Sequence, residues 1–113
     1  MRVSDYIVQF LENKGIEQVF MVTGGGAMHL NDAFGRSKKL NVVFTHHEQS
    51  AAMAADAYFR LANKPAVLQV TTGPGGINAL NGVYGAYVDS IPIIIISGQV
   101  RTNTLAYTVS SEL

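Results

Sequence analysis

The sequence contains no cysteine and no tryptophan, only three prolines, and no excess of either charge. Without cysteine, disulfides and thiolate metal sites are excluded, and the composition fits a reducing compartment, so we expect a cytoplasmic location. Eight basic and eight acidic residues give a formal net charge of zero, which lacks the basic excess that binding to nucleic acid requires. We therefore expect no nucleic-acid partner.

Long apolar runs are missing as well. The most apolar segment, residues 91–96, is far shorter than the roughly 20 residues that a helix needs to span a bilayer, so we expect no membrane segment. What the chain does contain is 48% hydrophobic residues in a length of 113, which is enough for one folded core. With no proline- or serine-rich linker, we expect a single domain over residues 1–113.

Helical and strand patterns alternate along the chain. Helical periodicity is expected over residues 4–14, 27–34, 48–61 and 75–87, and apolar runs predict strands over 19–22, 42–45, 65–70 and 91–96. Ser4 is the expected N-cap of the first helix and Gly15 its stop. This alternation predicts an α/β fold, an open parallel sheet with helices on both faces. The isoleucines of the last strand favour a central place in that sheet.

Polar or glycine-rich segments follow the expected strands. They are residues 23–26, 45–48, 71–76 and 97–99. Because the carboxyl ends of parallel strands lie at the same edge of a sheet, we expect these segments to gather there. Open α/β sheets bind their ligands at this edge, so the sequence predicts one shared ligand site.

Glu48 directly follows the second expected strand and begins an alanine-rich helix. An acid at this place either stabilises the helix dipole, by about 0.3 to 1 kcal/mol, or addresses a ligand. The alanines Ala51, Ala52, Ala54 and Ala55 leave the helix without bulk. That surface allows close packing beside a cofactor or a partner subunit.

The glycines Gly24, Gly25 and Gly26 permit a tight turn and a close approach of the backbone to a flat ligand. A dinucleotide-binding fingerprint fails, because its third glycine would fall on His29. A phosphate-binding P-loop fails too, because no lysine followed by serine or threonine comes after the glycines. A compact turn without a ligand remains the alternative.

His46, His47 and Glu48 are side-chain types that bind metals elsewhere. Consecutive strand residues point to opposite faces, however, and the helical zinc motif would need a histidine where Ala51 stands. We therefore expect no metal ligand here. His47 is either a pocket residue in contact with substrate or a polar residue satisfied at the end of a strand.

Several segments resemble one family in the correct order. Residues 71–78, Thr-Thr-Gly-Pro-Gly-Gly-Ile-Asn, are similar to the T-S-G-P-G-x-x-N segment of the acetolactate synthase group, with Thr72 in place of the serine. Residues 47–49 and 97–100 resemble further segments of the same group. Nearly the whole chain thus resembles the N-terminal pyrimidine-binding domain of thiamine-diphosphate-dependent enzymes, in particular the acetolactate synthase large subunit.

This resemblance implies that Glu48 is catalytic, with its carboxyl group on the pyrimidine N1′ of the cofactor. It implies a substrate or channel role for His47 and Gln99. The residues it assigns to binding of thiamine diphosphate are Gly24, Gly25, Gly26, Thr72, Gly73, Pro74 and Asn78. The implied reaction is decarboxylation of a 2-keto acid followed by carboligation, in a homodimer or larger assembly whose cofactor lies between subunits.

Two departures from the family limit what this chain does alone. It has no G-D-G motif, so Mg²⁺ and the diphosphate are expected to bind outside it. It also stops where the family's domain continues, so we expect a C-terminally truncated fragment of a longer multidomain enzyme. Two alternatives stay open: a subunit of a split 2-keto-acid decarboxylase, and a noncatalytic α/β module that binds a nucleotide or a protein through the same loops.

Overall fold

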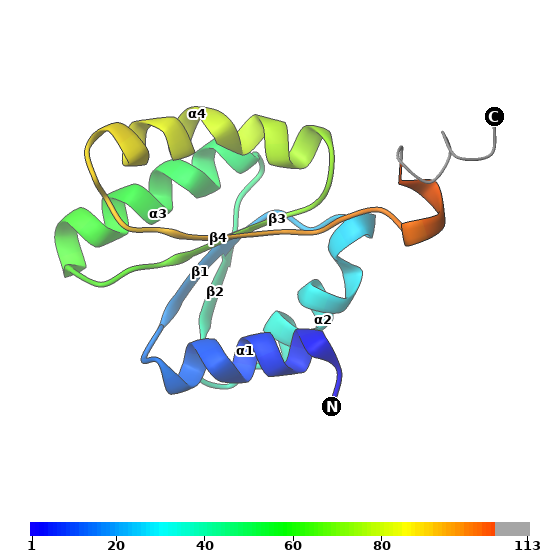
Figure 1. The fold of residues 1–113 in the computed structure, drawn as a ribbon. Helices are drawn as coiled ribbons and strands as arrows, with labels where there is room; N and C mark the ends of the chain where they lie inside the picture. The colour runs from blue at the N-terminus through cyan, green and yellow to red at the C-terminus, as the bar shows by residue number, and fades with distance from the viewer. Residues whose placement is uncertain (106–113) are drawn as a thin grey trace.

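A computed structural model describes residues 1–105 and confirms the α/β fold (Figure 1). Its elements are, in order, α1 (Val3–Asn13), β1 (Gln18–Met21), the 3₁₀ turn η1 (Gly25–Ala27), α2 (Met28–Arg36), β2 (Asn41–Phe44), α3 (Glu48–Ala62), β3 (Val67–Val70), α4 (Pro74–Val88), β4 (Ile94–Ser97) and the 3₁₀ turn η2 (Thr102–Thr104). Every predicted helix and strand is present. Within these residues no helix is both long and apolar enough to cross a membrane.

The four strands form one parallel sheet in the order β2-β1-β3-β4. The prediction of a central last strand is wrong, because β4 lies at an edge among the described residues. Its isoleucines face both sides of the sheet: Ile94 and Ile96 pack toward α1, and Ile95 is 46% exposed on the other side. An apolar run indicates that both faces of a strand are apolar, but it does not indicate whether the strand has one neighbour in the sheet or two.

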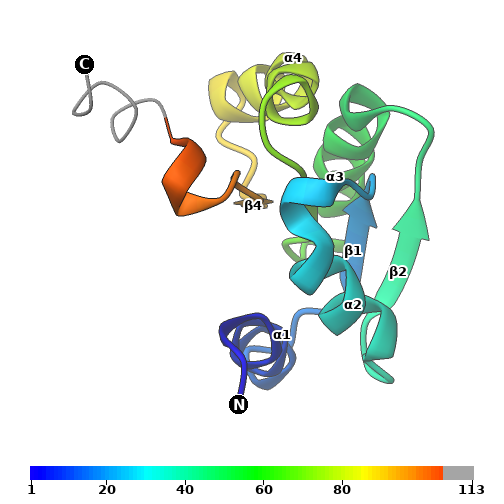
Figure 2. The same ribbon diagram turned by 90° about the vertical axis from the view of Figure 1, so that its right-hand side faces the viewer.

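Helices cover the two faces of the sheet in pairs, α1 with α2 and α3 with α4 (Figures 1 and 2). The first core joins α1 and α2 to the sheet through Leu11, Phe34, Val19 and Met21. Phe34 is fully buried, and burial of such a side chain contributes about 1.5–3 kcal/mol. Because each face has its own core, the loops at the strand ends are held from both sides.

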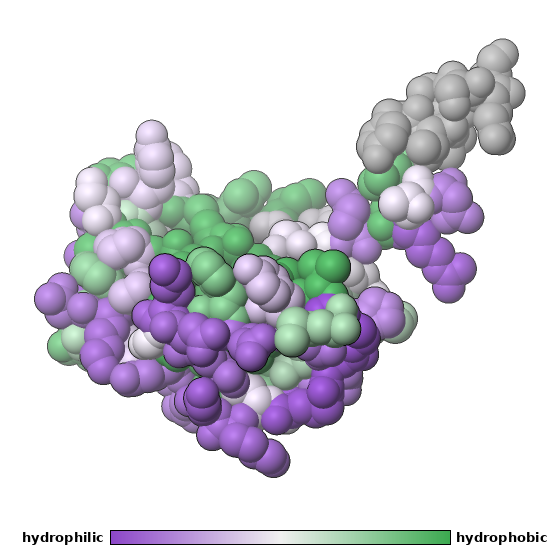
Figure 3. Space-filling model, turned by 60° about the horizontal axis from the view of Figure 1, so that its bottom comes forward, coloured by the Kyte–Doolittle hydropathy of each residue, from purple (hydrophilic) through white to green (hydrophobic). Residues whose placement is uncertain are grey.

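The free edge of β4 leaves an apolar groove beside α1. The groove has a volume of about 370 Å³ and is lined by Tyr6, Ile7, Phe10, Leu11, Ile94 and Ile96. Figure 3 views this side of the molecule and shows hydrophobic residues flanked by hydrophilic ones. The described residues therefore leave part of the α1 face uncovered where β4 has no outer neighbour.

The alanines of α3 pack inside this chain. Ala51, Ala52 and Ala55 are fully buried in the second core, and a Cβ built on Gly82 of α4 would lie 2.5 Å from the Cβ of Ala52. The expectation that these alanines face a cofactor or a partner subunit is therefore wrong for these three. Their small size instead brings α3 and α4 close together.

The ends of the helices differ in detail from the predictions. Helix α1 begins at Val3, so Ser4 is not its N-cap; its side chain is buried, and its Oγ has no hydrogen-bond partner in the described part of the chain. Gly15 follows the helix with φ of 76°, as a glycine stop should. Helix α3 runs one residue beyond its predicted end and is closed by Asn63, a residue in the left-handed conformation with φ of 53°.

The ladder of β4 begins at Ile94, three residues later than predicted. The preceding residues serve the end of α4 instead: Ile91 N donates to the carbonyl of Ala86 at 2.8 Å, and Ser90 has φ of 56°. Pro92 has no N–H with which to extend the ladder. These local bonds compete with strand pairing and shorten the strand.

A network of four charged side chains joins α1 to α2. Arg2 donates to Asp5 at 3.0 Å and to Asp32 at 2.6 Å, and Arg36 donates to Asp5 at 2.5 Å. The hydrogen bond from Arg2 is the largest cause that holds the pKa of Asp5, and that of Asp32, below the ordinary range. These ion pairs link α1 to α2 on the exposed surface of the protein.

We predict that Asp5→Asn lowers the unfolding temperature at pH 7 and that its effect shrinks in acid. A carboxylate whose folded pKa lies below its unfolded value of about 3.9 stabilises the fold above that value and loses its contribution as pH falls through the folded pKa. Thermal unfolding of both proteins between pH 7 and pH 2 should thus show converging curves below about pH 4. A constant difference across that range would contradict the assigned ion pairs.

A second prediction concerns the contact between α3 and α4. Gly82→Ala should destabilise the protein by about 1–3 kcal/mol, because the new methyl group meets the buried Ala52. Gly85→Ala is the matched control, because a Cβ there has no described atom within 4 Å; it should stabilise the helix by about 0.5–1 kcal/mol. Urea unfolding of both variants checks this, and equal effects would show that the close approach of the helices does not depend on Gly82.

Candidate functional site

The four loops at the carboxyl edge of the sheet converge, as the sequence predicts. Gln99 N donates to the carbonyl of Gly26 at 3.1 Å, and Thr72 Oγ1 donates to Gln99 Oε1 at 2.9 Å. Asn78, on the first turns of α4, reaches Glu48 at the start of α3. Segments that are far apart in sequence therefore form one surface.

Thr71, the residue after β3, is the point where three of these loops meet: it contacts the loop of residues 23–26, and its carbonyl accepts a hydrogen bond from Ser97 Oγ at 3.2 Å. A Cβ on Gly24 would lie 2.5 Å from the Cβ of Thr71, and a Cβ on Gly75 would lie 2.7 Å from its Cγ2. A Cβ on Gly26 would lie 3.0 Å from its Oγ1. Those distances are too short for side chains, so the glycines permit a close approach. The Oγ1 of Thr71 is buried and has no hydrogen-bond partner among residues 1–105.

Glu48 is the first residue of α3 and is half-buried beside α4. Its Oε2 accepts a hydrogen bond from Asn78 Nδ2 at 3.0 Å, and its Oε1 lies 3.2 Å from the place that a Cβ on Gly75 would take. One carboxylate oxygen is thus fixed by an amide, while the other has no such partner in the described residues. This arrangement leaves Oε1 for a hydrogen bond to a ligand.

His47 caps α3. Its Nδ1 accepts a hydrogen bond from Gln49 N at 3.0 Å, and its carbonyl accepts one from Thr45 Oγ1 at 2.8 Å. Of the two roles expected for His47, the geometry displays the satisfied polar residue. Its contact with substrate stays a prediction.

The loop from Thr72 to Pro74 turns the chain from β3 into α4. Gly73 has φ of 62°, a conformation that favours glycine, and Pro74 is the first residue of α4. The carbonyl of Gly73 accepts a hydrogen bond from Ile77 N at 3.0 Å. The predicted cofactor loop is therefore a tight turn in which Gly73 and Pro74 are exposed.

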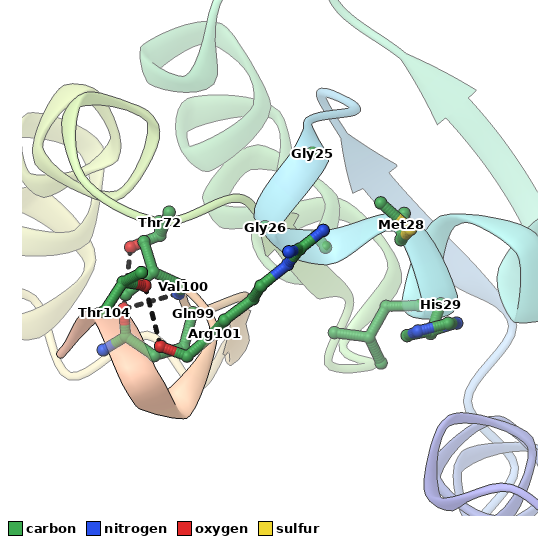
Figure 4. Close-up of a pocket in the computed structure, with 11 residues that line it drawn as sticks. Gly25, Gly26, Met28, His29, Thr72, Gln99, Val100, Arg101 and Thr104 are labelled. Carbon is green, nitrogen blue, oxygen red and sulfur yellow. Dashed lines mark hydrogen bonds between the residues drawn. The ribbon is translucent and has the colours of Figure 1, made fainter.

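A pocket of about 780 Å³ opens on the far side of this turn, between η1, the start of α2 and the segment after β4 (Figure 4). It is lined by Gly25, Gly26, Ala27, Met28, His29, Leu30, Thr72, Gln99, Val100, Arg101 and Thr104. The structure thus separates the predicted residues into two neighbouring groups: Gly25, Gly26, Thr72 and Gln99 line the pocket, whereas Glu48 and Asn78 lie outside its lining.

Sequence reasoning missed Arg101 and His29. Arg101 comes directly after the segment expected at the carboxyl edge, so the same edge rule, carried two residues beyond Gln99, would have found it. His29 was considered only as the residue that breaks a dinucleotide fingerprint. In the part of the chain that the structure describes, no three side chains of the types His, Cys, Asp or Glu are placed to hold a metal ion.

The fold and the converging loops define a parallel α/β domain with a candidate ligand site at its carboxyl edge. Residues 1–112 match the family described as thiamine pyrophosphate enzyme, N-terminal TPP binding domain. The chain belongs to this family.

Individual relatives agree with the family match. The chain is 37% identical over 109 residues to the acetolactate synthase large subunit of Buchnera aphidicola subsp. Schizaphis graminum, covering 96% of this chain and 19% of the relative. It is 39% identical over 102 residues to the large subunit of Haemophilus influenzae, covering 90% and 18%. It is 39% identical over 97 residues to the chloroplastic acetolactate synthase of Arabidopsis thaliana, covering 86% and 14%. The chain therefore spans less than a fifth of the length of these relatives.

The residues at the carboxyl edge of the sheet fit the aromatic ring of thiamine pyrophosphate, the cofactor named in the family description. A flat heterocycle needs open backbone beside it, which Gly25 and Gly73 offer because no described atom lies within 4 Å of their Cβ positions. It also needs a hydrogen-bonding group for its ring nitrogen, which Glu48 Oε1 offers. The orphaned Thr71 Oγ1 is a further polar atom in the same place. The donor set suits the aromatic ring of thiamine pyrophosphate.

We predict that Gly26→Ala destabilises the protein by about 1–3 kcal/mol, because its Cβ would lie 2.7 Å from Thr72 Cγ2. Gly25→Ala is the control, because a Cβ there has no described atom within 4 Å, and its effect should stay within about 0.5 kcal/mol. Thr72→Ser removes the obstructing Cγ2, so it should recover part of the stability lost in Gly26→Ala. Thermal unfolding of the four proteins gives the comparison, and an equal loss in both glycine variants would refute the proposed contact.

Proposed function

We propose that this chain is the pyrimidine-binding part of a longer, thiamine-diphosphate-dependent enzyme of the acetolactate synthase type, which decarboxylates a 2-keto acid and joins the product to an acceptor. The geometry of the Glu48 carboxyl group supports this proposal. Its Oε2 accepts a hydrogen bond from Asn78, and its Oε1 lies beside Gly75, which has no side chain. When bound, thiamine diphosphate supplies a nucleophilic carbon and takes up the electron pair left by carbon dioxide.

Glu48 holds a proton at Oε1 that it shares with the nitrogen of the pyrimidine ring. Such general acid–base assistance contributes about 10²- to 10⁴-fold to a reaction rate. Asn78 is a positioning residue, because its amide fixes Oε2 and so leaves Oε1 for the ring. The start of α3 places the carboxylate at the positive end of a helix dipole, which favours its negative charge when the proton moves to the ring.

The other predicted residues bind and orient. The backbone of Gly24 to Gly26 and the turn of Thr72, Gly73 and Pro74 would hold the flat ring, because no described atom lies within 4 Å of the Cβ positions of Gly25 and Gly73. Gln99 is fixed by Thr72 Oγ1 and by Val100 N, which donates to its Oε1 at 2.8 Å. That leaves the amide nitrogen of Gln99 to donate to a substrate oxygen, and His47, the residue before Glu48, is the second residue proposed to contact the substrate. Mg²⁺ and the diphosphate are held by a domain outside this chain.

Helix α4 offers the surface for assembly. Ile77, Leu80, Tyr84 and Tyr87 are between 58% and 81% exposed, and they recur at helical spacing along one side of α4. Burial of one such face against a second copy removes a large apolar area from water. A homodimer that covers α4 would place the start of α4, and with it Asn78 and Glu48, next to the partner subunit.

Glu48→Gln in the complete protein tests the proposal. The amide keeps the size and the hydrogen bonding of the side chain but does not exchange a proton at Oε1, so we expect decarboxylation of a panel of 2-keto acids to fall by about 10²- to 10⁴-fold. Binding of thiamine diphosphate, followed by isothermal titration calorimetry, should persist, as should the far-ultraviolet circular dichroism spectrum.

Glu17→Gln is the matched control, because Glu17 lies before β1 at the opposite edge of the sheet, where its carboxylate forms an ion pair with Lys64 at 2.8 Å. Loss of that exposed pair should cost at most about 1 kcal/mol of stability and leave turnover unchanged. Undiminished turnover in Glu48→Gln would remove Glu48 from the mechanism. Complete absence of 2-keto-acid turnover in the unaltered protein, with cofactor and Mg²⁺ present, would refute the proposed reaction.

A further inference from the structure

The pocket beside η1 is lined by a cationic side chain, Arg101, that has no role in the proposed mechanism. Arg101 follows β4, and Figure 4 shows its side chain extended across the pocket, with the guanidinium group near Gly26 and Met28. It is the one formally charged side chain among the described residues that line the pocket. No carboxylate lines the pocket with it.

Arg101 also differs from the other arginines of the chain. Arg2, Arg36 and Arg60 all form ion pairs with aspartates at 2.5–3.2 Å. Among residues 1–105, Arg101 has no ion pair, and its backbone carbonyl alone is engaged, as the acceptor of a bond from Thr104. A guanidinium group presents several N–H donors in a plane that matches a carboxylate, so this one is free to bind an anion.

The walls of the pocket define the rest of the ligand. Met28, Leu30 and Val100 supply apolar surface, and the first turn of α2 contributes the positive end of its helix dipole. Thr72 and Gln99 connect the pocket to the loop of residues 71–76, whose Gly75 adjoins Glu48. A volume of about 780 Å³ suits a small molecule. The surroundings therefore fit a short apolar chain that ends in an anionic group.

Arg101 is unsuited to bind the carboxylate of a 2-keto acid that is lost as carbon dioxide. Decarboxylation converts that group to neutral carbon dioxide, so a guanidinium ion bound to it would stabilise the ground state more than the transition state and slow the reaction. A group that stays charged throughout has no such disadvantage. It gains the same binding in the ground state and in the transition state.

We infer that Arg101 selects a 2-keto acid whose side chain carries a second anionic group, with that group bound by the guanidinium at the outer end of the pocket. This inference rests on the proposed function for the reaction, but the binding of a dianion by Arg101 is independent of it. Arg101 is thus a specificity-determining residue and takes no part in the transfer of protons or electrons.

The test compares ligands of equal carbon number on the complete protein. For turnover, kcat/KM is measured with 2-oxoglutarate and with 2-oxopentanoate; for binding alone, glutarate and pentanoate are titrated by calorimetry. The proteins are the unaltered one, Arg101→Gln, Arg101→Lys, and Lys38→Gln as a control. Lys38 is an exposed cation between α2 and β2 and does not line the pocket.

The unaltered protein should prefer 2-oxoglutarate over 2-oxopentanoate, and Arg101→Gln should lower the ratio of the two kcat/KM values by about 10- to 100-fold, mostly through KM, as expected for loss of a charge-assisted bond. Arg101→Lys should keep part of the preference, because it retains the charge but not the planar fork. Lys38→Gln should keep the full ratio. Glutarate binding should weaken in parallel.

Three outcomes separate this inference from the proposed function. An unchanged ratio in Arg101→Gln, with active enzyme, overturns the inference and leaves the proposed function standing. Arg101-dependent binding of glutarate in a protein without 2-keto-acid turnover supports the anion site while the proposed reaction fails. Equal binding of glutarate by the unaltered protein and Arg101→Gln, or no binding by either, overturns the inference whatever the turnover.

Discussion

The close approach of three loops around Thr71 is the constraint on which the site depends. The side chain of Thr71 occupies the end of β3 and leaves no room for a Cβ on Gly24, Gly26 or Gly75. Gly24 and Gly26 belong to the turn at η1, and Gly75 belongs to the start of α4, so the absence of their side chains sets how far η1 and α4 lie from the sheet. Larger residues would push these elements outward and would separate the carboxylate of Glu48 from the glycine-rich loops.

The same use of small residues sets the second distance that matters, the one between α3 and α4. Ala52 against Gly82 lets the two helices meet closely, and Glu48 and Asn78 then face each other across their amino-terminal ends at 3.0 Å. A stable contact in the middle of the helices thus fixes a hydrogen bond at their ends. The position of the Glu48 carboxylate therefore depends on the packing of α3 against α4, and a substitution that separates the two helices would also displace the carboxylate.

The sequence was sufficient for the features that depend on periodicity. Alternation of strand and helix patterns predicted the parallel sheet, and the edge rule then brought Glu48, Thr72 and Gln99 to one side before any contact was known. It could not give the neighbours of a strand, because the apolar run of β4 is the same whether that strand is central or at an edge. Nor does the sequence show which residue begins the first helix. Helix α1 begins at Val3, Arg2 before it pairs with Asp5, and Ser4 is buried inside the helix and does not cap it.

The candidate site was only partly predictable for a related reason. A motif points to residues that sit inside it, such as Glu48 and Gly73, whereas a pocket gathers any residue that the chain brings to its walls. Arg101 belongs to no motif, and its importance comes from facing Met28 and His29 on another element without a carboxylate nearby. Such a relation becomes visible only in three dimensions. In the same way, the capping bond of His47 depends on the precise place where α3 begins.

In the proposed mechanism, Asn78 binds Glu48 Oε2 and thereby leaves Oε1 for a ring nitrogen of the cofactor. A crystal structure of the complete protein with thiamine diphosphate and Mg²⁺ measures this directly. We expect Oε1 to lie about 2.6–3.2 Å from a nitrogen of the pyrimidine ring, with Asn78 still bound to Oε2. A pyrimidine ring bound elsewhere, beyond hydrogen-bond reach of Glu48, would contradict it.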